Sequence, residues 1–136
     1  MVVDTTGSFI TNLESVVVAE GENVILSCQS DTPVNWQRRL FSASRPINSE
    51  RICYNGEIME GYEDEFSINV DHTEQPPKYT LIILNADIND SGEYTCIGNA
   101  GLGDSVSAYL IVYGKDGVKL LCLFYCSWFI EMLLLL

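Results

Sequence analysis

The sequence is poor in positive charge and in histidine, and this shortage excludes several classes of function. Seven Lys and Arg residues stand against 19 Asp and Glu residues, which gives a formal net charge of −12. Such an acidic surface repels phosphate backbones, so we expect no nucleic-acid partner. The single histidine, His72, has no second imidazole with which to build a zinc site or an acid–base pair. We therefore expect no enzymatic activity, no catalytic residues, no cofactor and no bound metal.

One acidic run bears on the expectation about metals. Five carboxylates lie within nine residues, at Glu57, Glu60, Glu63, Asp64 and Glu65. Clustered oxygen ligands suit calcium, but this spacing fits no calcium-binding loop pattern. We favour a solvated, charged strand edge, which also opposes aggregation between sheets.

Helical periodicity is missing before residue 118. Apolar residues instead alternate with a period of two, as in Val24, Leu26 and Cys28, and the same alternation returns in five further runs up to residue 112. Turn signals separate the runs. The strongest is Asn55-Gly56, because both central positions of a type I′ turn need positive φ, and it predicts a hairpin over 52–59. Many short strands without helices predict an all-β antiparallel sandwich.

The chain length suits one domain, and a hydrophobic content of 47% is enough for one packed core. We expect this domain at residues 9–113, followed by a linker at 114–117. Residues 118–136 are almost wholly apolar and predict a membrane-anchoring segment, complete or truncated, although its length is marginal and Glu131 interrupts it. A lipid-anchor signal and a non-native or alternatively spliced end remain alternatives. The first residues lack the pattern of a signal peptide, so we expect a fragment or mature form of a longer protein.

Cysteine, tryptophan and tyrosine form a spaced framework. Cys28 and Cys96 both occupy the inward parity of their strands, with 67 residues between them, and Trp36 follows eight residues after the first. A disulfide across two facing sheets, with the indole packed on it, accounts for all three facts. Such a bridge is typical of an oxidising compartment.

On these residues the sequence resembles the immunoglobulin superfamily. Residues 24–28 are similar to strand B, Trp36 to the tryptophan of strand C, and residues 81–96 to strands E and F. Tyr94, two residues before Cys96, matches the tyrosine corner. The resemblance implies an immunoglobulin-like β-sandwich whose core residues include Trp36, Leu81, Asp90 and Tyr94.

Two features resemble the variable type: room for two extra strands between the cysteines, and the hairpin at 52–59. The short F–G region at 96–103 is closer to intermediate-set adhesion domains, which weakens the alternative of an antigen- or immune-receptor variable domain. Family members usually carry Arg before Phe66, paired with the aspartate that matches Asp90, but this sequence has Glu65. The alternatives are that Arg38 takes this place, or that backbone amides of the turn alone hold Asp90.

The face made by strands C, F and G is the expected binding surface, because variable-type relatives commonly bind through it. The outward residues expected there are Gln37, Arg39, Ile97, Asn99, Tyr109 and Ile111. Aromatic and Arg residues of this kind are enriched in interface cores. Glu14 and Asn69 are expected on the opposite sheet.

The resemblance implies a cell-surface recognition or adhesion module that binds a protein partner, with a second copy of itself included among the partners. Together with the apolar C-terminal segment, it predicts an extracellular domain held to the membrane by that segment, or a secreted one if the segment is not native. The rival interpretation is a structural spacer domain in a larger multi-domain protein. Asn89-Asp90-Ser91 is an N-glycosylation sequon in the E–F turn. Cys53, Cys122 and Cys126 are left over after the core bridge.

Overall fold

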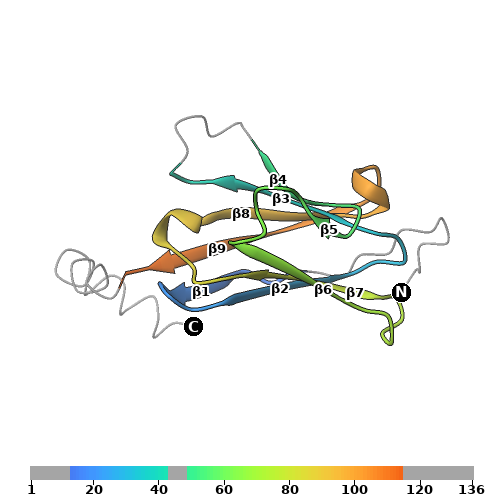
Figure 1. The fold of residues 1–136 in the computed structure, drawn as a ribbon, viewed down its shortest axis with the longest axis horizontal. Helices are drawn as coiled ribbons and strands as arrows, with labels where there is room; N and C mark the ends of the chain where they lie inside the picture. Colours follow the sequence, from blue (N-terminus) through green and yellow to red (C-terminus); the bar gives the residue numbers. More distant parts are fainter. Residues whose placement is uncertain (1–12, 43–48, 115–136) are drawn as a thin grey trace, which may run out of the picture.

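The computed structural model describes residues 13–42 and 49–114, and these form a sandwich of two β-sheets (Figure 1). The larger sheet has six strands in the order β1-β9-β8-β3-β4-β5, and the smaller has three in the order β2-β7-β6. The strands are β1 (Val16–Ala19), β2 (Val24–Gln29), β3 (Asn35–Leu40), β4 (Glu50–Tyr54), β5 (Glu57–Ile58), β6 (Phe66–Asp71), β7 (Lys78–Ile83), β8 (Gly92–Ile97) and β9 (Ser105–Tyr113). Two short 3₁₀ helices, η1 (Ile88–Asp90) and η2 (Asn99–Gly101), complete the described part.

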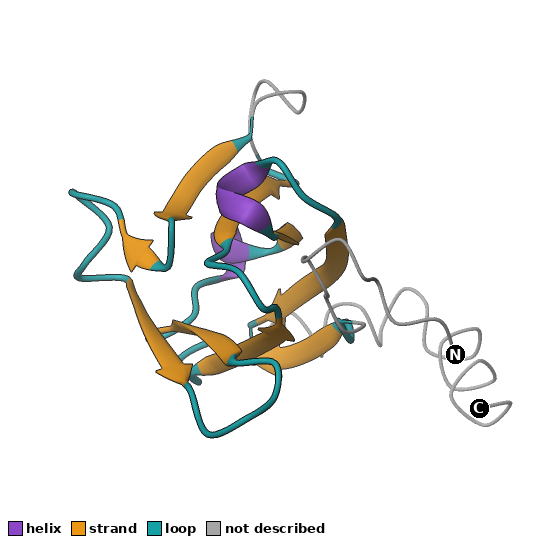
Figure 2. Ribbon diagram, turned by 90° about the vertical axis from the view of Figure 1, so that its right-hand side faces the viewer, coloured by secondary structure: helices purple, strands orange, loops and turns teal. Residues whose placement is uncertain are grey.

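The strands follow the two-residue alternation of the sequence. In β7 and β8 every second side chain is buried, and in β9 the buried positions 108, 110 and 112 alternate with exposed ones. Alternation of this kind gives each sheet one apolar face, and the side chains of the two apolar faces form one buried core. Figure 2 shows the two sheets as separate layers. The predicted all-β immunoglobulin-like sandwich is confirmed.

The bridge between Cys28 and Cys96 joins β2 of the smaller sheet to β8 of the larger. Trp36, Leu81 and Tyr94 are fully buried, at 0% exposed surface each. The predicted disulfide is therefore confirmed.

The hairpin predicted at 52–59 is formed by β4 and β5, which pair through Cys53 with Ile58 and Tyr54 with Glu57. Asn55 and Gly56 have φ of 53° and 82°, the positive values that a type I′ turn requires. This hairpin extends the larger sheet beyond β3.

The position of β1 differs from expectation. It pairs in parallel with β9, Val17 lying opposite Ile111, so the first described strand belongs to the larger sheet. Glu14 lies two residues before this strand and belongs to neither sheet. The alternating pattern gives the orientation of each side chain but not the sheet that a strand joins. Asn69 lies in β6 of the smaller sheet and is exposed, as expected.

The predicted membrane segment at 118–136 lies outside the described residues, as do residues 1–12 and 115–117. Within residues 13–42 and 49–114, no helix has the length and apolar character needed to cross a bilayer. The domain boundaries at 9 and 113 stay predictions.

Candidate functional site

Exposed apolar side chains gather on the outer face of the larger sheet, where β1, β9 and the end of β3 lie. Val17, Phe41, Tyr109 and Ile111 expose 66%, 54%, 51% and 41% of their surface. We call these four residues the apolar strip. Of the large hydrophobics exposed in the described part of the chain, only Ile25 lies within a strand of the smaller sheet. The two faces of the sandwich therefore differ in character.

The strip is continuous across its elements. The rings of Phe41 and Tyr109 stack with centroids 6.1 Å apart and planes inclined by 24°. Tyr109 and Ile111 are two residues apart on β9, so their side chains point to the same face. Ile111 lies opposite Val17 in the parallel pair of β1 and β9. Contact between the two rings favours this arrangement, in which both contribute to one surface.

Hydrogen bonds of the main chain position the strip. The Phe41 amide donates to the Ser91 carbonyl at 3.0 Å, which ties the end of β3 to the turn before β8. The Tyr109 amide donates to Ser15 Oγ at 3.0 Å, which fixes the start of β1 against β9. Phe41 and Tyr109 thus depend on contacts between segments that are far apart in the sequence.

Charged residues border the strip. Arg39 lies opposite Glu93, and Glu93 lies opposite Tyr109, so a cation, an anion and an aromatic ring follow one another across β3, β8 and β9. Arg51 on β4 is exposed and lies 5.3 Å above the ring of Tyr54. Among the Lys and Arg residues in the described part of the chain, only Arg39 and Arg51 are exposed, and both belong to this sheet.

The structure places the six expected binding residues unevenly. Arg39, Tyr109 and Ile111 are exposed, while Gln37 and Ile97 are half-buried near the middle of the sheet. Asn99 is not on the strand, because β8 ends at Ile97 and Asn99 begins the turn η2 with a φ of 50°.

The chain leaves the ladder at this point because the Asn99 amide donates to Thr32 Oγ1 of a neighbouring loop at 2.7 Å. The expectation that Asn99 extends the strand F surface is therefore wrong, although its side chain is exposed.

Sequence reasoning missed two members of the strip. Phe41 continues the outward parity of positions 37 and 39, and this signal was sufficient to find it. Val17 faces outward between two half-buried valines, but nothing in the local pattern told which sheet its strand joins. The parallel pairing with β9 supplies that information.

A second cluster of polar residues lies at one end of the sandwich, around Arg38. Its guanidinium donates to Asp90 Oδ1 at 3.0 Å, to the Tyr94 hydroxyl at 3.3 Å and to Glu50 Oε2 at 3.5 Å. It also lies 5.0 Å above the ring of Phe66. Arg38 is 6% exposed, so this positive charge is held inside the domain by its anionic and aromatic neighbours.

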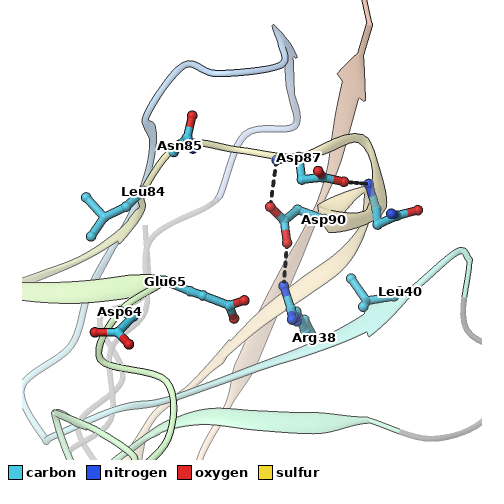
Figure 3. Close-up of a pocket in the computed structure, with 9 residues that line it drawn as sticks. Arg38, Leu40, Asp64, Glu65, Leu84, Asn85, Asp87 and Asp90 are labelled. Atoms are coloured by element: carbon cyan, nitrogen blue, oxygen red, sulfur yellow. Dashed lines mark hydrogen bonds and ion pairs between the residues drawn. The ribbon is translucent and has the colours of Figure 1, made fainter.

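Figure 3 shows the pocket that this cluster lines, with a volume of about 500 Å³. Arg38 and Asp90 lie on one side, and Asp64 and Glu65 extend from the start of β6 on the other. The carboxylates of Asp90 and Asp87 accept hydrogen bonds from backbone amides of the turn. Among the described residues, no group of three His, Cys, Asp or Glu side chains is placed to hold a metal ion. The cluster acts as a structural clamp between β3, β8 and η1.

Two buried groups in the interior are chemically inert near neutral pH. Burial raises the pKa of the Tyr94 hydroxyl to about 12, and this hydroxyl donates to the Asp90 carbonyl at 2.6 Å. Burial also raises the pKa of the Cys53 thiol to about 11, and the thiol contacts the Val34 carbonyl at 3.7 Å. A thiol that stays protonated is a poor nucleophile, so Cys53 is unreactive near neutral pH.

Comparisons with known proteins agree with this architecture. A family model described as Immunoglobulin I-set domain matches residues 7–112. No curated protein matches the chain. Among solved structures, the "Crystal Structure of the RIG-5 IG1 homodimer" superposes with a TM-score of 0.64 and 17% identity, covering 79% of this chain and 99% of that one. At this identity the likeness shows the fold alone. The match of the family model over most of the chain shows that it belongs to the immunoglobulin I-set domain family.

Proposed function

We propose that the domain is a cell-surface recognition or adhesion module that binds a protein partner through the outer face of its larger sheet. The observation that carries this proposal is the apolar strip, a continuous exposed surface of two aliphatic and two aromatic side chains. Tyr and Arg are enriched among the residues that dominate binding energy at interfaces, and here Tyr109 belongs to the strip while Arg39 lies beside it. The disulfide between Cys28 and Cys96 supports an extracellular location.

The charge distribution supports a protein partner on this face. The acidic run at 57–65 starts in β5, at the edge of the sheet opposite β1. The apolar strip lies toward the β1 edge, where Glu93 is paired across the ladder with Arg39. The apolar strip is thus separated from this acidic run, and Arg39 supplies a positive charge beside it.

A second copy of the chain belongs among the partners to be tested. A structural neighbour is described as a homodimer, and the strip combines apolar groups with both signs of charge, which allows a face to pair with its own copy. A net charge of −12 on each copy opposes such pairing at low salt. Self-association is therefore expected to strengthen as salt is raised, whereas binding to a basic partner is expected to weaken.

The test is a binding screen of the full chain in mild detergent against cell-surface ectodomains and against itself, at low and high salt. Tyr109→Ala and Ile111→Asp are expected to weaken the interaction found by about 1 kcal/mol or more, since central aromatic and apolar contacts dominate such interfaces. Asn69→Ala on the smaller sheet is the matched control and is expected to leave binding unchanged. Binding that survives both strip variants overturns the proposal, and a chain with no ligand favours the spacer role.

A further inference from the structure

The sequon Asn89-Asp90-Ser91 is built into a turn in which nearly all of its polar atoms have partners. The backbone amide of Asn89 donates to Asp87 Oδ1 at 2.8 Å. The Asp90 carboxylate accepts from Arg38 and from the backbone amide of Asp87. The Asp90 carbonyl accepts from the Tyr94 hydroxyl at 2.6 Å. This turn is therefore fixed by the bond to β3 and by its own cap, which Figure 3 shows, and by the bond to β8.

Ser91 is held most firmly. Its Oγ accepts from the Val112 amide at 2.9 Å and donates to the Val112 carbonyl at 3.4 Å. Its own amide donates to the Ile88 carbonyl, and its carbonyl accepts from Phe41. The hydroxyl that completes the sequon is thus engaged on both sides by β9, a strand that follows later in the chain.

Asn89 itself remains open. Its side chain is exposed on η1 and borders the pocket beside Arg38. A glycosyltransferase must contact both the side-chain amide of Asn89 and the hydroxyl of Ser91. In the folded domain the Asn89 side chain is accessible, whereas the Ser91 hydroxyl is bonded to β9. Because the third position of a sequon must carry a hydroxyl, the enzyme has to reach that hydroxyl.

We propose that Asn89 is an N-glycosylation site that accepts its glycan only before β9 docks against the turn. The donor is a lipid pyrophosphate-linked oligosaccharide. Asn89 Nδ2 forms the bond to the sugar C1, the bond from C1 to the pyrophosphate oxygen breaks, one amide proton is lost and the lipid pyrophosphate leaves. Once β9 pairs, the hydroxyl of Ser91 is withdrawn, and an unmodified chain stays unmodified. The proposal rests on the extracellular location put forward above.

The attached glycan is compatible with binding. Asn89 belongs to η1, which contacts the end of β9 and precedes β8, whereas the proposed binding surface is the outward side of the larger sheet. The exposed amide projects from the turn at the end of the sandwich. Modification at this position therefore adds a polar, solubilising group without replacing any member of the apolar strip.

The test uses the full chain, produced without glycans in a bacterial host and kept in mild detergent, with purified oligosaccharyltransferase and its lipid-linked donor. One sample is oxidised and folded, and the other is reduced, alkylated and shown by circular dichroism to be unfolded. We expect glycan transfer, read as a mass shift that peptide N-glycosidase removes, to be at least about tenfold faster in the unfolded sample, because the folded turn must first open. Asn89→Gln is expected to abolish transfer in both.

Equal rates in the two samples, or no transfer in either, overturn the proposal. A second variant tests the cause: Asp90→Ala keeps the sequon but removes the carboxylate that accepts hydrogen bonds from Arg38 and from the Asp87 backbone amide. The folded D90A protein is expected to accept glycan several times faster than the folded parent, since a weakened turn opens more often. An unchanged rate shows that these bonds do not protect the site. Because the assay uses no cell, its outcome is independent of whether the domain functions at a cell surface.

Discussion

Arg38 and Asp90 form an ion pair at 3.0 Å between strand β3 and the turn η1. Relatives usually form the pair with an Arg placed where this chain has Glu65, at the start of β6. Here Glu65 is exposed and lies across the pocket from Arg38 (Figure 3). In this chain the cation that pairs with Asp90 comes from β3 of the larger sheet. The clamp consequently joins η1 to β3 of the larger sheet, which also contains β8, the strand that follows η1.

Removing the charge of Arg38 is expected to destabilise the domain strongly. Arg38→Met keeps much of the apolar stem but leaves Asp90 and Glu50 without their cation, and we expect a loss of about 2–4 kcal/mol in the free energy of unfolding. Urea denaturation measures this change. Arg39→Ala is the matched control on the next, exposed position, and it is expected to cost less than about 0.5 kcal/mol. Equal losses in the two variants contradict the clamp.

A glycine at the tip of the sandwich is constrained by its surroundings as well as by its backbone. Gly101 has a φ of 98°, and a Cβ there meets Asn35 Nδ2 at 2.7 Å. Asn35 is buried and its Oδ1 accepts from the Asn55 amide at 2.9 Å, so this side chain cannot move away without losing that bond. Gly61, with a φ of 95° and open space around it, has only the backbone constraint.

Gly101→Ala is therefore expected to cost more than Gly61→Ala. The left-handed backbone alone costs about 1–2 kcal/mol with a Cβ, and overpacking adds roughly 1–3 kcal/mol at Gly101. Denaturation of both variants separates the two contributions. The Asn55 amide resonance should shift only in Gly101→Ala, and a shift of similar size in Gly61→Ala would show that Asn35 does not link the two loops.

Stability is expected to fall at alkaline pH because of Cys53. The ordinary pKa of its thiol is 9.0 and burial raises it to about 11 in the folded domain. The unfolded chain therefore loses this proton at a lower pH than the folded domain does. The stabilisation of the fold by the protonated thiol is complete below pH 9.0 and is lost as the pH rises to about 11. The loss from this group is roughly 2–3 kcal/mol, since each unit of pKa shift corresponds to about 1.4 kcal/mol. Tyr94 adds a similar decline from pH 10.0 to about 12.

Cys53→Ala isolates the thiol. Urea midpoints measured between pH 8 and 10 should fall in the parent and stay nearly flat in this variant, because Tyr94 titrates mainly above that range. Peptide mapping without reduction should confirm that Cys28 and Cys96 remain joined throughout. Parallel curves for the two proteins contradict a buried, protonated Cys53.

The sequence predicted the fold because its strongest signals are local or come in matched pairs. Alternation assigned the strands, Asn55-Gly56 assigned the hairpin, and matching parity assigned the disulfide. The placement of β1 was not predictable, since pairing with β9 links segments about ninety residues apart and leaves no local pattern. For the same reason Asn99 was misplaced: its hydrogen bond to Thr32 ends β8, and this contact is tertiary. Arg38 was only one of two alternatives for the partner of Asp90. The alternation along a strand predicts the face to which the Arg38 side chain points, but not its distance from Asp90.

The stacked pair of Phe41 and Tyr109 distinguishes a binding role from a stabilising one. Both rings are about half exposed, so truncating either removes little buried area, and we expect Phe41→Ala and Tyr109→Ala each to change stability by less than about 1 kcal/mol. In an interface the same rings become fully buried, and each truncation is then expected to weaken binding by about 1–2 kcal/mol or more.

The double variant decides whether the rings act as a unit. Residues in contact are expected to show a coupling energy of about 0.5 kcal/mol or more in binding, measured as the departure of Phe41→Ala/Tyr109→Ala from the sum of the single changes. Ile25→Ala provides the control, because this residue is also an exposed large hydrophobic but lies on the smaller sheet. An exposed ring pair whose loss lowers stability and spares binding has a structural role, and the binding surface must then be sought elsewhere on the sandwich.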